Sequence, residues 1–154
     1  MTDADLPTDK RYGDIRILSR PAIKALAEPQ KPCAVISITN TDADKAKLRR
    51  LRNVQGVLRI SFDENDFGPA HARRIWEFVR SCDGEMQTYL IHSMADRVRS
   101  ASVAAGLALL RGGGWDEVKE IFTNYDAEKG IYQVMRDTYS AVFTPQAEVA
   151  ISKG

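Results

Sequence analysis

The segment at residues 87–110 reads QTYLIHSMADRVRSASVAAGLALL, and it decides the fold that we expect. Its short apolar run, YLI, predicts a buried strand, and residues 100–110, rich in Ala, Leu and Val, predict a buried helix. The loop between them, residues 92–98, points its backbone N–H groups and the positive end of the helix at one place. That arrangement suits an anion, most often phosphate, and Arg97 and Arg99 are placed to hold it through paired hydrogen bonds.

The length and charge of the chain limit the classes of protein to consider. At 154 residues it is long enough to bury a real core as one domain, which we place at residues 11–143. The polar residues 1–10 are expected to be a disordered N-terminal tail and residues 144–154 a C-terminal tail. With 22 basic and 21 acidic residues the formal charge is +1, which gives no electrostatic footprint for nucleic acid or an anionic membrane. Any anion site must therefore be local.

Two cysteines, Cys33 and Cys82, are too few for a disulfide framework and are interpreted as buried, reduced thiols. The N-terminal residues MTDADLPTDK carry charge and have no apolar region, so they do not resemble a signal peptide. No apolar run approaches the ~20 residues of a membrane span. A cytoplasmic protein is expected.

Strands and helices are predicted to alternate along the chain. CAVISIT, at Cys33–Thr39, is a nearly continuous β-branched run, typical of a strand buried on both faces of a parallel sheet. Such alternation predicts an α/β fold: a mostly parallel central sheet of about four to five strands flanked by helices on both faces. The other strands are expected at 14–18, 56–62 and the opening apolar run, and the helices at 21–27, 41–52, 69–81, 100–110, 115–124 and 128–143.

Two helices show a clear inward face at helical spacing. His71 and Trp76, in the helix at 69–81, are interpreted as packing residues and not as ligands. The side chains expected to face inward are Ala72, Ile75, Trp76 and Val79 in that helix, and Ile131, Val134, Met135, Tyr139 and Val142 in the last one; Arg73, Arg74, Glu77 and Arg80 are expected to face water.

The loop HSMADRVRS, residues 92–100, resembles the signature loop of the cysteine-dependent protein tyrosine and dual-specificity phosphatases. In that family His, Cys, five further residues, Arg and Ser or Thr follow a strand. The likeness extends upstream to ISITNTD, to LRISFDEND and to a helix ending WEFV, which look like the small bacterial and phage-type members. It covers roughly residues 33–143.

The resemblance implies a role for each matching residue. Arg99 corresponds to the phosphate-clamping arginine, Ser100 to the hydroxyl that lines the loop, and either Asp63 or Asp66 to the general acid. Ser93 stands at the position of the nucleophile. The resemblance further implies a phosphorylated protein or small phosphoester as partner, and no metal or cofactor is expected. The near-neutral charge and the lack of an apolar span argue against nucleic acid and membrane as partners. The oligomeric state stays open. The phosphate-binding residues would be Ser93, Met94, Ala95, Asp96, Arg97, Val98, Arg99 and Ser100.

Serine at position 93 changes the expected chemistry. In the family a cysteine thiolate, its pKa lowered by the loop's N–H groups and the helix terminus, attacks phosphorus. A serine hydroxyl has a far higher pKa and needs an adjacent general base. The neighbouring His92 comes from the end of a strand, where successive side chains point to opposite faces. We therefore predict no useful turnover.

Asp96 is a second departure, because the family places a glycine three residues after its cysteine. Asp tolerates left-handed backbone angles better than most residues, so the loop can still form. If its carboxylate pointed inward at ~5 Å from a phosphate charge, repulsion at an effective dielectric of ~20 would cost roughly 3 kcal/mol. If it points outward, or pairs with Arg97 or Arg99, anion binding survives. The sequence leaves both arrangements open.

Three interpretations of Ser93 remain. A natural pseudophosphatase, which has kept the fold and lost the reaction, accounts for Ser93 and Asp96 together and is the one we favour. A working phosphomonoesterase whose cysteine has been replaced by serine needs only one change. The last is a generic α/β protein in which residues 92–100 are an ordinary connection between a strand and a helix.

Overall fold

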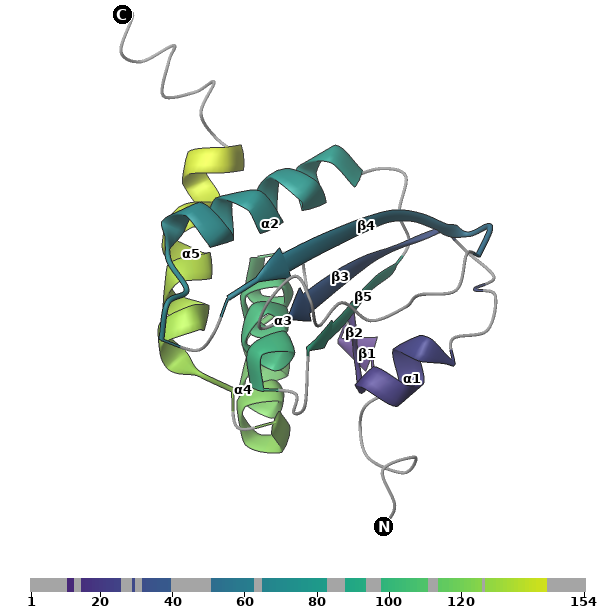
Figure 1. Cartoon of the computed structure of the whole chain (residues 1–154). Coiled ribbons are helices and arrows are strands. Elements are labelled where there is room, and N and C mark those ends of the chain that lie inside the picture. The colour runs from purple at the N-terminus through teal and green to yellow at the C-terminus, as the bar shows by residue number, and fades with distance from the viewer. Residues whose placement is uncertain are drawn as a thin grey trace, which may run out of the picture.

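The computed structural model describes residues 11–12, 15–25, 29, 32–39, 51–62, 65–82, 88–93, 98–110, 114–125 and 127–143. Within these ranges two strands are followed by a helix, two further strands, a second helix, the fifth strand and then the last three helices (Figure 1). The strands are β1 (Arg11–Tyr12), β2 (Ile15–Leu18), β3 (Cys33–Thr39), β4 (Val54–Ser61) and β5 (Thr88–Ser93), and the helices are α1 (Arg20–Lys24), α2 (Pro69–Cys82), α3 (Val98–Leu110), α4 (Gly114–Tyr125) and α5 (Lys129–Phe143).

The strands form one sheet in the order β1-β2-β5-β3-β4. All the pairings between β2, β5, β3 and β4 are parallel, and the short β1 adds an antiparallel edge to β2. Every residue of β3 is buried, as expected for a strand covered on both faces. The predicted α/β fold with a mostly parallel sheet is confirmed.

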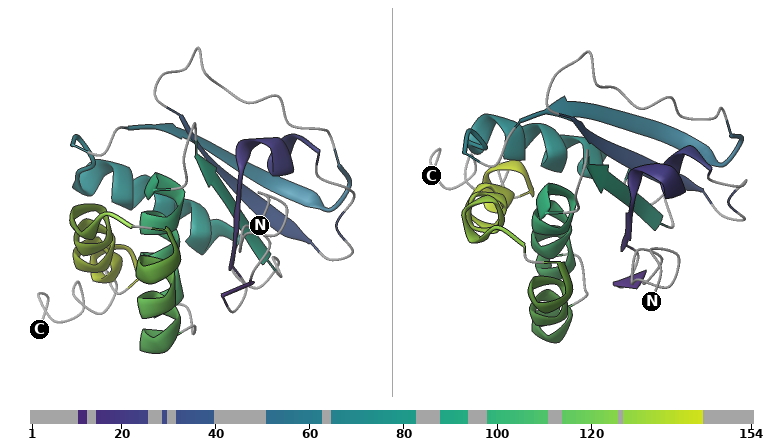
Figure 2. Two further views of the ribbon diagram at one scale, coloured as in Figure 1. Left: turned by 90° about the horizontal axis from the view of Figure 1, so that it is seen from below. Right: turned by 60° about the horizontal axis from the view of Figure 1, so that its bottom comes forward.

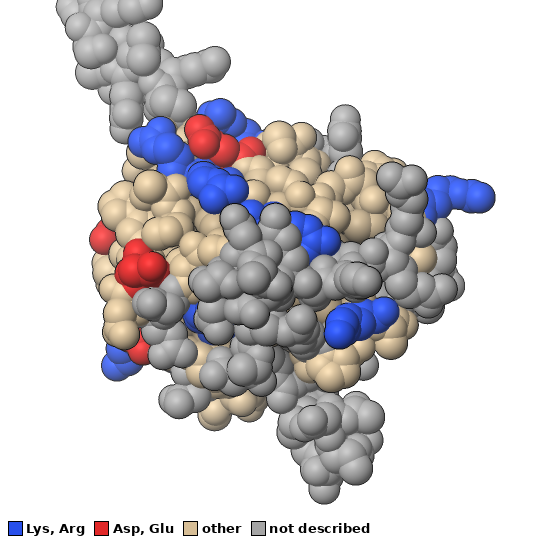
Figure 3. All heavy atoms as spheres, in the orientation of Figure 1, with Lys and Arg blue, Asp and Glu red and all other residues tan. Residues whose placement is uncertain are grey.

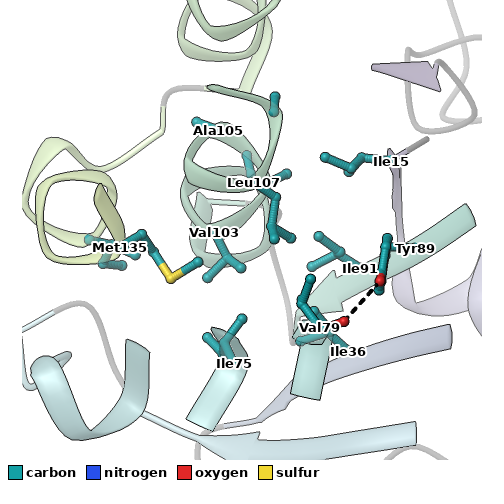
Figure 4. Packing of buried hydrophobic residues seen from close by; sticks show 14 of the residues in the cluster. Ile15, Ile36, Ile75, Val79, Tyr89, Ile91, Val103, Ala105, Leu107 and Met135 are labelled. Atoms are coloured by element: carbon teal, nitrogen blue, oxygen red, sulfur yellow. Dashed lines mark hydrogen bonds between the residues drawn. The ribbon is translucent and has the colours of Figure 1, made fainter. Parts of the chain in front are cut away.

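Helices cover both faces of the sheet, but unequally (Figure 2). The larger face carries α2, α3 and α5, and α4 packs on α3. Its core joins strand residues such as Ile36 and Ile91 to Ile75, Val103 and Met135 of the helices (Figure 4). The other face carries α1 over a much smaller cluster, which consists of Leu18, Ile23, Cys33, Val35 and Leu90.

Both cysteines are buried thiols, as predicted. Trp76 is likewise the packing residue that we expected, because its ring is fully buried and its Nε1–H donates to the Met135 carbonyl at 2.7 Å. His71 stacks on Phe67, and its Nδ1 accepts the backbone N–H of Gly68.

The charged side chains of α2 were also predicted correctly. Arg73, Arg74, Glu77 and Arg80 are all exposed. Basic and acidic side chains are mixed on the upper part of the face shown in Figure 3.

Several predicted boundaries were wrong. β5 continues through His92 to Ser93 and α3 begins at Val98, so the loop predicted at 92–98 is only residues 94–97, which lie outside the described residues. The sequence did not predict this extension of β5, because His92 and Ser93 are polar. Pairing with β2 and β3 nevertheless keeps them in the strand.

Other boundaries moved for similar reasons. β4 begins at Val54 and not at 56. The helix expected at 41–52 falls mostly outside the described residues, but its end was wrong, because residues 51–53 form a turn into β4. α1 ends at Lys24, earlier than expected, and β1 was not predicted.

Candidate functional site

Ser93 is the last residue of β5, and its side chain faces α3. It pairs with Ile38 of β3, which belongs to the core on the α3 side of the sheet. His92 pairs with Leu18, which lies in the cluster beneath α1. Because successive side chains of a strand point to opposite faces, the His92 ring and the Ser93 hydroxyl lie on opposite sides of the sheet. His92 therefore cannot take the proton of Ser93 directly.

The hydroxyl of Ser93 is bonded to Ser100, in the first turn of α3. Ser93 Oγ accepts the backbone N–H of Ser100 at 3.3 Å and donates to Ser100 Oγ at 3.1 Å. Both side chains are buried. These two bonds hold the end of β5 against the start of α3, and so they fix the two ends of the intervening loop.

Arg99 is buried although it carries a positive charge. Only 5% of its surface is exposed, and its Nη1–H donates to the Phe62 carbonyl at 2.8 Å. Phe62 directly follows β4 and directly precedes the acidic turn that begins at Asp63. The Arg99 side chain thus connects the start of α3 to the chain segment expected to carry the general acid.

The structure places some of the predicted site residues and not others. Ser93, Arg99 and Ser100 come together at the junction of β5 and α3, and Val98 begins that helix. Asp66 lies in the turn before α2 with its side chain exposed. The remaining predicted site residues, Asp63, Met94, Ala95, Asp96 and Arg97, lie outside the described residues.

Ser102 supports this site and was missed in the sequence. Its Oγ donates to the Val98 carbonyl and accepts the backbone N–H of Glu128, both at 2.6 Å. The first turn of α3 is therefore tied to the connection between α4 and α5. The available signal was a second serine within the apolar helix after Ser100, whose hydroxyl needs a hydrogen-bond partner when buried.

The chemistry open to these groups is anion binding. α3 presents its N-terminus at the loop, where the helix dipole favours negative charge. The Arg99 guanidinium adds a full positive charge beside it.

Among the described residues, no group of His, Cys, Asp and Glu side chains is placed to hold a metal ion. None of the described helices is both long and apolar enough to span a membrane.

Comparison with solved structures gives the same fold in several phosphatases. A mouse protein assigned as a dual-specificity phosphatase, solved with zinc tungstate, matches with a TM-score of 0.64 and 16% identity over 96% of this chain and 95% of its own. Human DUSP28 matches with a TM-score of 0.59 and 17% identity over 88% and 96% of the two chains. PTPMT1 in complex with PI(5)P matches with a TM-score of 0.53 and 16% identity over 75% and 81%.

No protein-family model matches the sequence, and no curated protein matches it. The chain is therefore similar to the protein tyrosine and dual-specificity phosphatases in its fold, at sequence identities of 16–17%.

Proposed function

We propose that this protein binds the phosphate group of a phosphorylated protein or small phosphoester at residues 93–100 and does not hydrolyse it. The fold supports the site, because phosphatases of the same architecture include one solved with tungstate, an oxyanion of phosphate-like shape, and one solved with a phosphoinositide. The buried Arg99 and the N-terminus of α3 supply the positive charge at the loop.

Each residue has a role in this proposal. Arg99 clamps two phosphate oxygens, and the backbone N–H groups of Met94 to Val98 surround the anion. Ser100 orients Ser93 through the two hydrogen bonds between them. Asp63 or Asp66 stands where an active relative would hold its general acid.

The environment of the Ser93 hydroxyl is the main support for proposing that the protein does not hydrolyse phosphoesters. Its proton is directed to Ser100 Oγ, another hydroxyl, which is no base at neutral pH. The His92 ring lies across the sheet. A serine whose proton is held by another hydroxyl stays protonated, so its nucleophilicity is weak.

The alternative is a phosphomonoesterase disabled only by its serine, and hydrolysis of an aryl phosphate separates the two. The proteins to compare are the chain as it stands, Ser93→Cys, and Ser93→Cys combined with Asp96→Gly. We expect no turnover in the first two and recovery in the double variant, because the Asp96 charge persists in the single one. Full activity in Ser93→Cys alone would establish the disabled enzyme, and inactivity of all three would assign the loop another purpose.

Binding tests the anion site separately from catalysis. We expect inorganic phosphate and a phosphotyrosine peptide to bind by titration calorimetry, and Arg99→Ala to weaken both about ten- to a hundredfold, since hydrogen bonds to a charged group contribute about 1.5–3 kcal/mol. Arg74→Ala, an exposed arginine of α2, is the matched control and should change nothing. Circular dichroism checks that Arg99→Ala is folded. A folded Arg99→Ala that binds as tightly as the unmodified chain contradicts the proposal.

A further inference from the structure

A cavity of about 570 Å³ lies between α4 and α5, outside the anion loop. Its volume falls within the range of small-molecule sites, roughly 300–1,000 Å³. α5 leaves the end of α4 in a different direction (Figure 2), and side chains of both helices form the walls. The lining residues are Val118, Lys119, Phe122, Thr123, Lys129, Tyr132 and Gln133.

The apolar part of the cavity is aromatic. Phe122 of α4 and Tyr132 of α5 meet edge to face, with 5.4 Å between ring centroids. Val118, which is buried, adds an aliphatic surface. This lining accepts a flat apolar body of one or two rings.

The charged part of the lining is positive. Lys119 and Lys129 are both exposed at the mouth, and none of the described lining residues is an Asp or Glu. Gln133 donates its side-chain amide to the carboxylate of Asp137, a residue that keeps its negative charge but does not line the cavity. The two ammonium groups therefore select a negatively charged ligand.

The hydroxyl of Tyr132 is a polar group without a partner in this apolar wall. Only 7% of the residue is exposed, and its hydroxyl makes no hydrogen bond within the part of the chain that the structure describes. The hydroxyl oxygen itself has no exposed surface, so Tyr132 offers the cavity apolar surface and not its polar tip.

We propose that the cavity between α4 and α5 is a second ligand site, which binds a small aromatic carboxylic acid. The aromatic body lies against Phe122 and Tyr132, and the carboxylate lies between Lys119 and Lys129. The site is independent of the proposed phosphate site, because it shares no residue with 93–100. The bond from the Glu128 N–H to Ser102 places the start of α5 beside the first turn of α3, so the two sites belong to the same end of the helical layer.

Titration calorimetry with naphthalene-2-carboxylate tests the proposal on the full chain. We expect the carboxylate to bind at least fivefold more tightly than the uncharged naphthalene-2-carboxamide. Lys119→Met with Lys129→Met should remove that preference, because methionine keeps the apolar stem and loses the charge. Tyr132→Phe, which removes only the buried hydroxyl, should leave binding of the carboxylate unchanged.

Two controls place the binding in this cavity. Lys24→Met removes an exposed lysine of α1 and should bind the probe unchanged. Arg99→Ala should also bind it unchanged, which separates this site from the anion loop. The proposal is wrong if the probe does not bind, if the amide binds equally well, if the double lysine variant retains full affinity, or if Arg99→Ala abolishes binding.

Discussion

Gly106 allows α3 to approach α5 closely. A Cβ at this position would lie 2.7 Å from the Cβ of Met135, and a rotamer change cannot relieve a contact between two Cβ atoms. Gly106 is therefore a packing residue, although glycine is a poor helix former. Gly130, in the first turn of α5, differs because a Cβ there would meet only the end of the Glu128 side chain, at 3.7 Å.

We expect Gly106→Ala to lower the free energy of unfolding by up to about 2 kcal/mol, because the cost of overpacking, roughly 1–3 kcal/mol, is offset by a gain of only about 1 kcal/mol in helix propensity. Gly130→Ala is the matched control and should raise stability by up to ~1 kcal/mol. Urea unfolding followed by circular dichroism measures both. If Gly106→Ala is as stable as the unmodified chain, the helices adjust more easily than the structure indicates.

Residue-level predictions from sequence succeeded along the middle of the inward face of α5 and failed at its borders. Ile131, Met135 and Val142 of α5 are buried as predicted, whereas Val134 and Tyr139 are only half-buried. The buried Tyr132 and Thr138 were not predicted. Helical spacing identifies the face, but which borderline residue is covered depends on the neighbouring helix, whose position the sequence does not contain.

At the scale of elements, the Ser102 side chain links α3 to the connection between α4 and α5 through hydrogen bonds. One oxygen serves both sides, donating to the Val98 carbonyl and accepting the Glu128 N–H. Thr123 of α4 makes only the first kind of bond, to the Lys119 carbonyl, and it is exposed. Comparing Ser102 with Thr123 therefore separates the effect of the bond to Glu128 from the effect of a hydroxyl that bonds only within its own helix.

Ser102→Ala should lower the free energy of unfolding by about 1–2 kcal/mol, because it leaves a partly buried N–H without its acceptor. Thr123→Ala should change it by less than about 0.5 kcal/mol, as is usual for exposed positions. Thermal or urea unfolding of both variants gives the comparison. Equal effects of the two substitutions would show that the bond to Glu128 adds nothing.

The elements themselves were predicted well where one pattern extends over many residues. The β-branched run of β3 was correct at both ends, and α2 was within one residue. The predicted end of β5 and the predicted start of α3 were both wrong, because the polar residues at this junction belong to the strand and the helix. His92 and Ser93 are held in the strand by pairing with β2 and β3, contacts that join distant parts of the sequence.

At the scale of the whole molecule, the sheet divides the core into unequal halves. The face with α2, α3 and α5 contains most of the buried residues, whereas the α1 face has a small cluster and a helix of only five residues. Alternating strands and helices predicted the parallel sheet correctly. The position of β5 between β2 and β3 could not be predicted from the sequence, because the packing of helices on both faces of the sheet sets the strand order.

We expect the α1 face to open locally before the rest of the molecule, because little apolar surface holds it. The Ile23 amide, bonded to the Ser19 carbonyl in α1, should exchange with solvent at least a hundredfold faster than that of Ile36 in β3. Hydrogen exchange followed by NMR under native conditions measures both rates. Equal protection of the two amides would mean that the molecule opens only as one unit.

The unequal halves have a practical consequence, because each contains one thiol. Cys33 lies in the cluster beneath α1, and Cys82, the last residue of α2, lies in the larger core. Both are buried, so a thiol-specific reagent reaches either sulfur only when its own side of the sheet opens. Without any engineered label, the rate of alkylation at Cys33 reports on one face of the sheet and the rate at Cys82 reports on the other.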